Sequence, residues 1–500
     1  MMIDVNAPET LLLAALVIPL LAAVLIPLFH RTPNLRETVT LISAGALAWT
    51  VWSLAPHVVA GARPFVHLIT VAPGLDLAFR IEPLGMLFAL VSGTLWIVNS
   101  IYSIGYMRGH HEPRQTSFYV CFAIAISSAI GIAFSANLFT LFVCYEALTL
   151  STYPLVTHKA DEEAMKAGRV YLLLLLGTSM VFLLPAIIAT AVLAGTVDFA
   201  PGGILADKAT PTVLAFLLAL YAFGIGKAAL MPFHRWLPSA MVAPTPVSAL
   251  LHAVAVVKAG VFTIVKVVVY VFGIETLAKT GASEWLTVVA CVTLLLASAI
   301  AMTKDNLKAR LAYSTVSQLS YVVLGASLAV SAGIIGASLQ IAMHAVGKIT
   351  LFFCAGAIYV AAHKTEISEL TGLGRKMPFT FAAFLVGSLS IIGLPPFGGS
   401  WSKWWLLLGA LDAGQMAVVV VLILSSLLNV LYLLPIVFQA FFVPAPRLAS
   451  AGAAAAELPD GLERRYWLLV LPPCLTAIGC LILFLYVDRI VELIKPIATP

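Results

Sequence analysis

The stretch "IGKAALMPFHRWLP", which runs from Ile225 to Pro238, decides the fold class. It ends an apolar run that begins near Val213, places Lys227 at the end of that run and adds Pro232 five residues later. In water this pattern would be a helix end on a wet surface. In a membrane it would be a costly charge beside a broken helix, because proline removes a backbone donor and disrupts the turn before it. The choice depends on the solvent that the rest of the chain requires.

The composition identifies that solvent as lipid. The 500 residues are 61% hydrophobic and only 10% charged, with a mean hydropathy of +1.03, whereas a globular domain has about 25% charged residues. Continuous apolar runs of about 20 residues recur, each long enough to cross a bilayer as a helix. Barrel strands would be shorter and would alternate. We therefore predict an all-α integral membrane protein.

We predict about 14 transmembrane helices from these runs. The apolar run Leu11–Leu28 counts as the first, because it lacks the basic start of a signal peptide. The spans are centred near residues 20, 46, 94, 125, 147, 183, 221, 260, 293, 320, 347, 393, 428 and 478.

Lysine and arginine are distributed unevenly between the two sides. Loops after odd-numbered spans carry most of them, from Arg31 and Arg36 to Arg464 and Arg465. The other side holds Arg63, Arg80, Lys208, Lys279, Arg489 and Lys495. Because basic loops favour the cytoplasm, we predict a multi-pass protein of a bacterial inner membrane with both termini on the outer, periplasmic side.

The soluble segments are too short for a catalytic domain. The longest, 56–83 and 444–466, include the Ala/Pro-rich "VPAPRLASAGAAAAELPDGLE", which is typical of a flexible connector. The chain has no Gly-rich phosphate loop, haem motif or CxxC pair among its six cysteines. We expect no cofactor and no metal site, and no redox chemistry within the chain itself. The net charge of +5 lies in loops and does not indicate nucleic acid.

Six charges remain once the loop charges are set aside: Glu146, Lys227, Lys258, Lys266, Lys348 and Lys403. A charge at the membrane centre costs about 2.5–3.5 kcal/mol, so each is a functional candidate by default. The alternative is a side chain that snorkels from a helix end, and Lys266 is equally compatible with both. Because Glu146 is the only acid in this set, we expect any Na⁺ or K⁺ route to need another subunit.

Two of these charges are predicted to pair. Glu146 lies in "LFVCYEALTLSTYPLV", between apolar flanks, and would be neutral unless an opposing lysine keeps it charged. We expect Lys227, just before the break at Pro232, to be that partner. A buried lysine also loses and regains a proton readily.

The other candidates lie on three later spans. His252 and Lys258 are six residues apart, or about 120° around one helix; His252 is either a proton relay or a core donor. His344 and Lys348, in "MHAVGKITLFF", are four apart and share one face. Lys403 follows "IGLPPFGGSWSK", in which Pro395 and Pro396 break the span. Hydroxyl and amide groups near them, such as Ser314 and Ser426, are favoured as interhelical contacts, with a water chain as the alternative.

The two broken spans, seven and twelve, lie five spans apart. This layout predicts two related five-helix units of opposite orientation, a mark of transporter folds. The resulting division is 1–110 for flanking helices one to three, 111–275 for the first repeat and 280–443 for the second, inverted repeat. A connector over 444–465 and a last helix within 466–500 complete the chain.

Four motifs carry a family resemblance, in the order the family has them. "MPFHRWLPSAMVAPTPVSALLHAVAVVKAGVF" resembles the signature of the antiporter-like membrane subunits, and "YEALTLSTYPLV", "HAVGKITLFF" and "GLPPFGGSWSKWW" resemble its other landmarks. The family includes subunits of Mrp-type cation/proton antiporters, of respiratory complex I and of membrane-bound hydrogenases. The chain length resembles a D-type Mrp subunit, whereas "PTPVSALLHA" is nearer to A-type and hydrogenase-linked members.

The resemblance implies two inverted five-helix bundles crossed by a horizontal polar axis. It assigns proton transfer to Glu146, Lys227, His252, Lys258, His344, Lys348 and Lys403. We therefore expect a proton-translocating subunit of a hetero-oligomeric membrane complex, with an Mrp-type antiporter favoured. The alternatives are a proton-pumping subunit of a complex I-like or hydrogenase complex, and a structural subunit that does not conduct.

Overall fold

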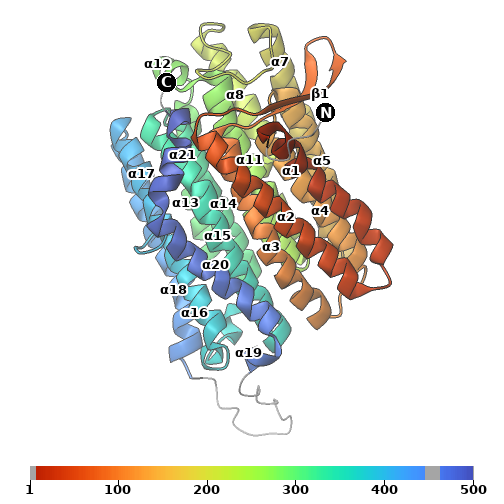
Figure 1. Cartoon of the computed structure of the whole chain (residues 1–500). Helices are drawn as coiled ribbons and strands as arrows, with labels where there is room; N and C mark the ends of the chain where they lie inside the picture. Colours follow the sequence, from red (N-terminus) through yellow and green to blue (C-terminus); the bar gives the residue numbers. More distant parts are fainter. Residues whose placement is uncertain (1–6, 445–461, 499–500) are drawn as a thin grey trace, which may run out of the picture.

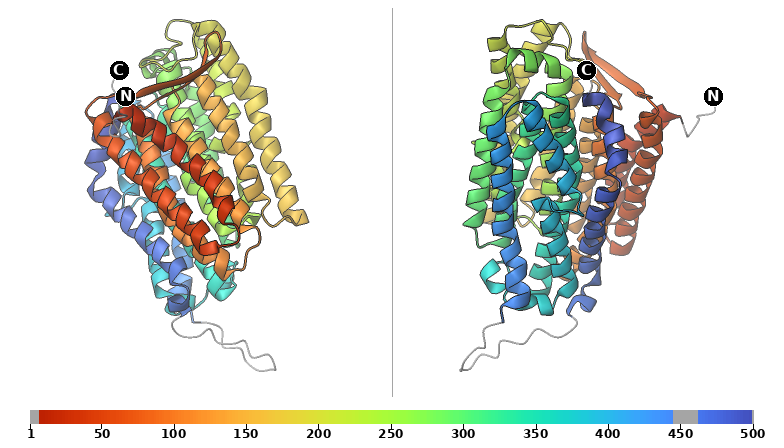
Figure 2. Two further views of the ribbon diagram at one scale, coloured as in Figure 1. Left: turned by 45° about the vertical axis from the view of Figure 1, so that its right-hand side comes forward. Right: turned by 90° about the vertical axis from the view of Figure 1, so that its left-hand side faces the viewer.

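The computed structural model describes residues 7–444 and 462–498, including all their side chains except those of His252 and Leu462. The described part is a bundle of long helices that run side by side, with one β-hairpin at one end (Figures 1 and 2). The predicted connector lies almost wholly outside the described residues, so its character stays a prediction.

The first third of the chain forms flanking helices and the hairpin. These elements are α1 (Pro8–Leu25), η1 (Ile26–Phe29), α2 (Pro33–Val59), β1 (Phe65–Ala72), β2 (Leu75–Arg80), α3 (Pro83–Gly109) and α4 (Gln115–Phe134).

The middle third is more irregular. It comprises α5 (Leu138–Val156), α6 (Glu162–Thr178), η2 (Ser179–Leu183), α7 (Leu184–Ala194), α8 (Pro211–Gly224), η3 (Gly226–Ala228), α9 (Trp236–Ser239), η4 (Ala240–Val242), α10 (Thr245–Ala249), η5 (Leu250–Val254), α11 (Val256–Val267), η6 (Val268–Phe272) and α12 (Ile274–Thr280). The segments η2, η5 and η6 are single π-helical turns within longer helices.

The last third returns to long helices. It comprises α13 (Glu284–Met302), α14 (Leu307–Ser327), α15 (Ser331–Ala362), η7 (Ile367–Glu369), η8 (Leu373–Arg375), α16 (Pro378–Ile392), α17 (Gly399–Asp412), α18 (Met416–Phe442), α19 (Leu462–Arg465), α20 (Trp467–Leu485) and α21 (Val487–Ala498).

Short polar residues and prolines set where these helices begin. The side chains of Asn137, Asp161 and Asn306 accept a hydrogen bond from the backbone N–H three residues ahead, at the starts of α5, α6 and α14. Pro33 and Pro83 occupy the first position of α2 and α3, where a missing N–H costs nothing.

The structure agrees with a multi-pass membrane protein. Among the described residues, ten helices are long and apolar enough to span a membrane, and the pair α11–η6 and α12, bent by 79°, adds up to one more. Every predicted span centre lies on a helix or in a break between two helices. Because α8 and α16 are short, with 14 and 15 residues, and α14 is more polar, the count of about 14 stays a prediction.

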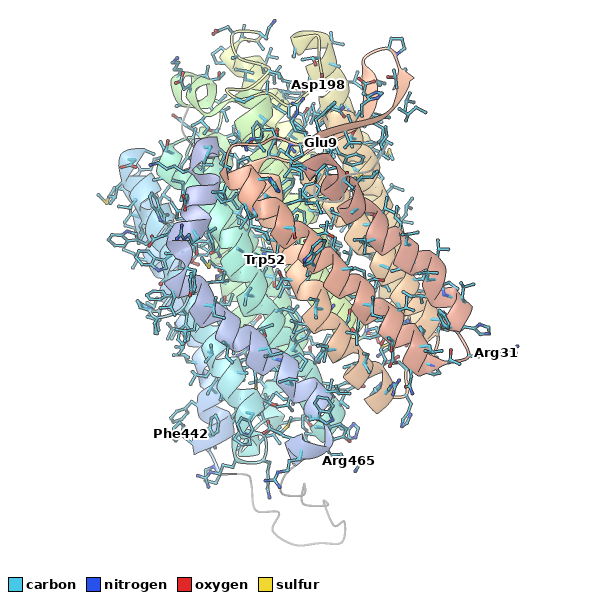
Figure 3. The ribbon with its side chains drawn as sticks, in the orientation of Figure 1. Glu9, Arg31, Trp52, Asp198, Phe442 and Arg465 are labelled. Atoms are coloured by element: carbon cyan, nitrogen blue, oxygen red, sulfur yellow. The ribbon has the colours of Figure 1, made fainter. Side chains whose placement is uncertain are left out.

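Within residues 7–444 and 462–498, the β1–β2 hairpin is the one departure from a helical architecture. Its strands pair antiparallel, with Val66 opposite Phe79, in a segment that the sequence identified only as soluble. The hairpin marks one end of the molecule. Figure 3 places Glu9 and Asp198 at this hairpin end, and Arg31 and Arg465 at the opposite end, which we call the basic end.

Side chains on the outer surface of the bundle are exposed, whereas those inside it are buried. The outward faces of the helices expose apolar side chains, such as Leu173 at 73% and Val192 at 79%. The 32-residue helix α15 is almost wholly buried and packs against α14, α16, α17 and α20. A central helix of this length brings its middle residues into contact with both halves of the chain.

Candidate functional site

The predicted charged residues lie deep in the bundle, in the middle of α5 and α15 and at or next to breaks in the other helices. We call the set Glu146, Lys227, Lys258, His344, Lys348 and Lys403 the polar axis. Each is at most 9% exposed. They come from α5, η3, α11, α15 and α17, so the fold collects residues that are far apart in the chain.

Lys227 has three neutral contacts. Its ammonium donates to the Tyr145 carbonyl at 2.8 Å and to the Thr149 hydroxyl at 2.6 Å. It also lies over the Tyr145 ring, 3.2 Å from the centroid. These groups solvate an ammonium without a counter-charge.

Glu146 does not form the ion pair that we predicted with Lys227. Within the described residues no carboxylate oxygen lies within 4.0 Å of the Lys227 ammonium, and both oxygens of Glu146 lack a hydrogen-bond partner. The Tyr145 carbonyl and the Thr149 hydroxyl, which lie on the same helix as Glu146, bind the ammonium instead. Glu146 is thus a buried acid whose oxygens are available to another donor.

The helix break near Lys227 lies where the sequence predicted it. Helix α8 ends at Gly224, and Lys227 lies in the short turn η3. Pro232 lies in the irregular segment between η3 and α9. The indole N–H of Trp236 donates to the Gly226 carbonyl at 2.9 Å, which satisfies one backbone group that the break leaves unpaired.

A close backbone contact joins η3 to α11. A Cβ atom at Gly260 would lie 2.3 Å from the Lys227 carbonyl carbon and from the Ala228 nitrogen. Only glycine allows this approach. It places the backbone of Lys227 against α11 two residues beyond Lys258.

Lys258 and His344 are hydrogen-bonded to each other through the ammonium and Nδ1. The sequence placed Lys348 beside His344 on α15, and the structure adds Lys258 from α11 to this pair. His252 lies on the π-helical turn η5 that precedes α11; its side chain is outside the described residues. The role predicted for His252 therefore stays a prediction.

Lys348 begins a chain of hydroxyl and amide groups. Its ammonium donates to the Leu311 carbonyl at 3.2 Å and to the Ser314 hydroxyl at 2.6 Å. Ser314 in turn is 2.9 Å from the Tyr432 hydroxyl, which donates to Asn429. This chain leads from α14 to α18.

Lys403 lies beyond the second break. Pro395 and Pro396 separate α16 from α17, as predicted. The Lys403 ammonium reaches back across the break to the carbonyl of Ile392, the last residue of α16, at 2.8 Å. It also donates to Ser426 at 3.1 Å, one helical turn before Asn429 on α18.

Three axis lysines therefore have the same pair of partners: one main-chain carbonyl and one hydroxyl. This holds for Lys227, Lys348 and Lys403. The sequence did not identify these partners of the lysines, but its favoured interpretation of Ser314 and Ser426 as interhelical contacts agrees with their hydrogen bonds to Lys348 and Lys403. A signal existed for Thr149, which is three residues after Glu146 and so lies near it on one helical face.

Lys266, left open by the sequence, forms an ion pair. Its ammonium is 3.3 Å from Oε2 of Glu82, and the side chains are 0% and 7% exposed. Glu146 is thus not the only acid buried among the spans. Glu82 escaped notice because it precedes the first residue of α3 and so looked like a loop residue.

A polar pocket approaches the axis from the basic end. It has a volume of about 320 Å³, and its lining includes Lys159, Asp161 and Lys308 near the surface. Ala355, two turns beyond Lys348 on α15, and Thr245 also line it. Within the described residues, no group of three or more His, Cys, Asp or Glu side chains could hold a metal ion.

Comparisons with known proteins place this chain in a family. The family model described as "NADH:quinone oxidoreductase/Mrp antiporter, TM" matches residues 135–429. The chain is 31% identical to NADH-quinone oxidoreductase subunit N of Desulforudis audaxviator over 97% of both chains. It is also 31% identical to an Na⁺/H⁺ antiporter subunit of Alkalihalophilus pseudofirmus over 86% of this chain, but spans only 56% of that relative.

A solved structure has the same fold. A chain of the Mrp complex from Dietzia sp. superposes with a TM-score of 0.84 at 24% identity, covering 98% of this chain and 97% of that one. At this identity the likeness shows the fold alone.

Proposed function

This chain belongs to the NADH:quinone oxidoreductase/Mrp antiporter family and is an antiporter-like membrane subunit, and on that premise we propose that it translocates protons along the polar axis. The observation that carries the proposal is the repeated lysine environment. A lysine whose partners are a carbonyl and a hydroxyl keeps both contacts as an ammonium. As a neutral amine it leaves no unpaired charge behind. Each lysine can therefore give up a proton and take another.

The order of transfer follows the contacts. Lys258 and His344 share one hydrogen bond, so a proton passes directly between α11 and α15. From Lys348 the hydroxyls of Ser314 and Tyr432 extend the route toward Ser426 and Lys403. Protons reach the axis through the polar pocket at the basic end, and Glu146 accepts a proton without losing an existing bond.

We further propose the division that the sequence predicted, with repeats over 111–275 and 280–443. The two helix breaks support it, because each places a lysine, Lys227 or Lys403, on the polar axis.

For the complex, we propose an Mrp-type cation/proton antiporter located in a bacterial inner membrane with the hairpin end outside. The similarity to the Na⁺/H⁺ antiporter relative supports this choice. Protons are the ions moved by this chain, because an axis of amines repels metal cations and offers few carboxylates; other subunits would carry Na⁺ or K⁺. The second candidate is a redox complex, supported by the full-length similarity to subunit N. Purification of the native complex and identification of its partner subunits separates the two.

Replacing Lys227 tests the axis. We expect Lys227→Ala to abolish proton translocation by the assembled complex in everted vesicles, because the proton carrier next to the break is lost. Lys279→Ala, at an exposed lysine of α12, is the matched control and should translocate normally. Normal translocation by Lys227→Ala, at equal amounts of complex in the membrane, would refute the proposal.

A further inference from the structure

The Glu82–Lys266 ion pair has no place in the axis, yet it is buried near the hairpin end. Lys266 is 0% and Glu82 6% exposed. The Lys266 ammonium also donates to the Ser135 carbonyl at 2.7 Å and lies 4.5 Å from the centroid of the Phe199 ring. A pair at this depth costs several kcal/mol of desolvation per ion.

A pocket connects this pair to the hairpin end. It has a volume of about 330 Å³, and Glu82 forms part of its wall. The exposed Pro201 and Gly202 lie at its rim. The charged and titratable groups that line it are Arg63, Arg80, Glu82 and Tyr270. Glu82 therefore lies between the pocket, which it lines, and the buried Lys266 ammonium, which is next to its Oε2.

The pair is also close to the polar axis. Lys266 and Lys258 lie on the same helix, α11, eight residues apart, which corresponds to about 12 Å along its length. Phe262 lies between them, with its ring 5.6 Å from the Lys266 ammonium. The π-helical turn η6 begins two residues after Lys266, and such turns are frequent at functional sites.

We propose that the Glu82–Lys266 pair is a proton-exchange site that connects the polar axis to the pocket at the hairpin end. Lys266 gives its proton to Oε2 of Glu82, so that the ion pair becomes a neutral amine beside a carboxylic acid. The acid then releases that proton to water in the pocket, and Lys266 regains one from the axis when water enters past Phe262. This inference rests on the proposed function of the axis.

The charges around the pocket favour a proton over a metal ion as the species exchanged. Arg63 and Arg80 give the pocket two positive charges against the single carboxylate of Glu82. A positive pocket repels Na⁺ and K⁺, and it favours the departure of a released proton. The competing interpretation is a structural tie between α3 and α11.

A variant in which both residues are uncharged, which we call the neutral pair, distinguishes a proton-exchange site from a purely structural ion pair. The double variant Glu82→Gln with Lys266→Met keeps the volume and removes both charges, so no charge is left buried without a partner. In the full complex we expect it to assemble and to lose proton translocation by about a hundredfold or more, the contribution typical of a proton-transfer group. The matched control is Glu37→Gln, at a buried acid paired with Arg108 near the basic end, which should translocate normally.

Blocking the pocket tests the route without altering the pair. Pro201→Cys places a thiol at the rim, and Lys208→Cys is a control in the same exposed loop. A bulky, membrane-impermeant thiol reagent should stop translocation in the Pro201→Cys complex only, whereas a methyl-sized reagent should not. Unchanged translocation after complete bulky labelling would overturn the inference even if the neutral pair fails to assemble.

Parallel measurement of Lys227→Ala distinguishes the two proposals. If Lys227→Ala is inactive while the neutral pair translocates like wild type, only the exchange site is refuted. If both translocate normally, the axis itself is refuted and the exchange site falls with it.

Discussion

At the scale of single residues, the hydrogen-bond partners of the lysines affect proton transfer more than the depth at which the lysines are buried. A carboxylate next to Lys227 would hold its proton, and removal of that proton would leave an unpaired anion in a dry site. The Tyr145 carbonyl and the Thr149 hydroxyl bind the ammonium and accept loss of its proton at lower cost.

Removal of one hydroxyl tests this view. Thr149→Val replaces the hydroxyl by a methyl group of similar size, and the Lys227 ammonium loses one of its two hydrogen bonds. A bond to a charged group contributes about 1.5–3 kcal/mol, so we expect translocation to fall by about ten- to a hundredfold. The rate of proton uptake by reconstituted vesicles is the measurement.

The control for this change is Thr263→Val on α11. Thr263 is equally buried, but its hydroxyl donates only to the Ala259 carbonyl of its own helix. Equal losses in the two variants would indicate a general effect of removing buried hydroxyls and would contradict the role given to Thr149.

At the scale of elements, the helix breaks turn main-chain groups toward the axis. The carbonyl of Ile392 is free to accept from Lys403 only because α16 stops there. Gly393 provides the turn, with φ of +91°, and a Cβ atom there would lie 2.6 Å from Cδ of Lys403. The side chain of Lys403 thus crosses the break by passing over a residue that has no side chain.

We predict that Gly393→Ala displaces Lys403 and reduces proton translocation. This loss should exceed the loss that destabilisation of the fold alone would cause. Two effects combine here, a strained backbone and a clash with the lysine, each worth about 1–3 kcal/mol. Gly414→Ala isolates the first, because Gly414 has φ of +67° and nothing within 4 Å of the added Cβ. Vesicle assays and thermal denaturation of both variants give the comparison; equal losses of translocation would show that contact with Lys403 is irrelevant.

Sequence reasoning found the helix breaks and the charged residues because both violate the apolar pattern of a span. Lys227, Lys403 and the prolines beside them were visible for this reason. The partners were not visible, since Ser314 and Tyr432 are 118 residues apart and meet only through packing. The expected Glu146–Lys227 pair was wrong because charge complementarity was considered without the nearer carbonyl and hydroxyl of α5. The hairpin was missed because its residues lie within a segment identified only by its polarity.

At the scale of the whole molecule, the fold has two distinct ends. Loops rich in lysine and arginine gather at the basic end, with Arg31 and Arg465 as labelled examples in Figure 3. The start of α1 and α21 lie at the hairpin end (Figure 1). The pocket that approaches the axis from the basic end and the pocket next to Glu82 both have charged residues in their walls, and they lie at opposite ends of the molecule. A proton that enters at one pocket and leaves at the other would cross the whole membrane.

The direction of that crossing depends on which end faces the cytoplasm. Basic loops are retained on the cytoplasmic side during insertion, so we expect the hairpin end to face outward. Asp198 and Arg31 are exposed at opposite ends, and each can be replaced by cysteine without disturbing a buried contact. A membrane-impermeant thiol reagent should label Asp198→Cys in intact cells and Arg31→Cys only in everted vesicles. The reverse labelling pattern would indicate the opposite orientation in the membrane. The pocket next to Glu82 would then be the cytoplasmic access to the axis, and the pocket at the basic end would face outward.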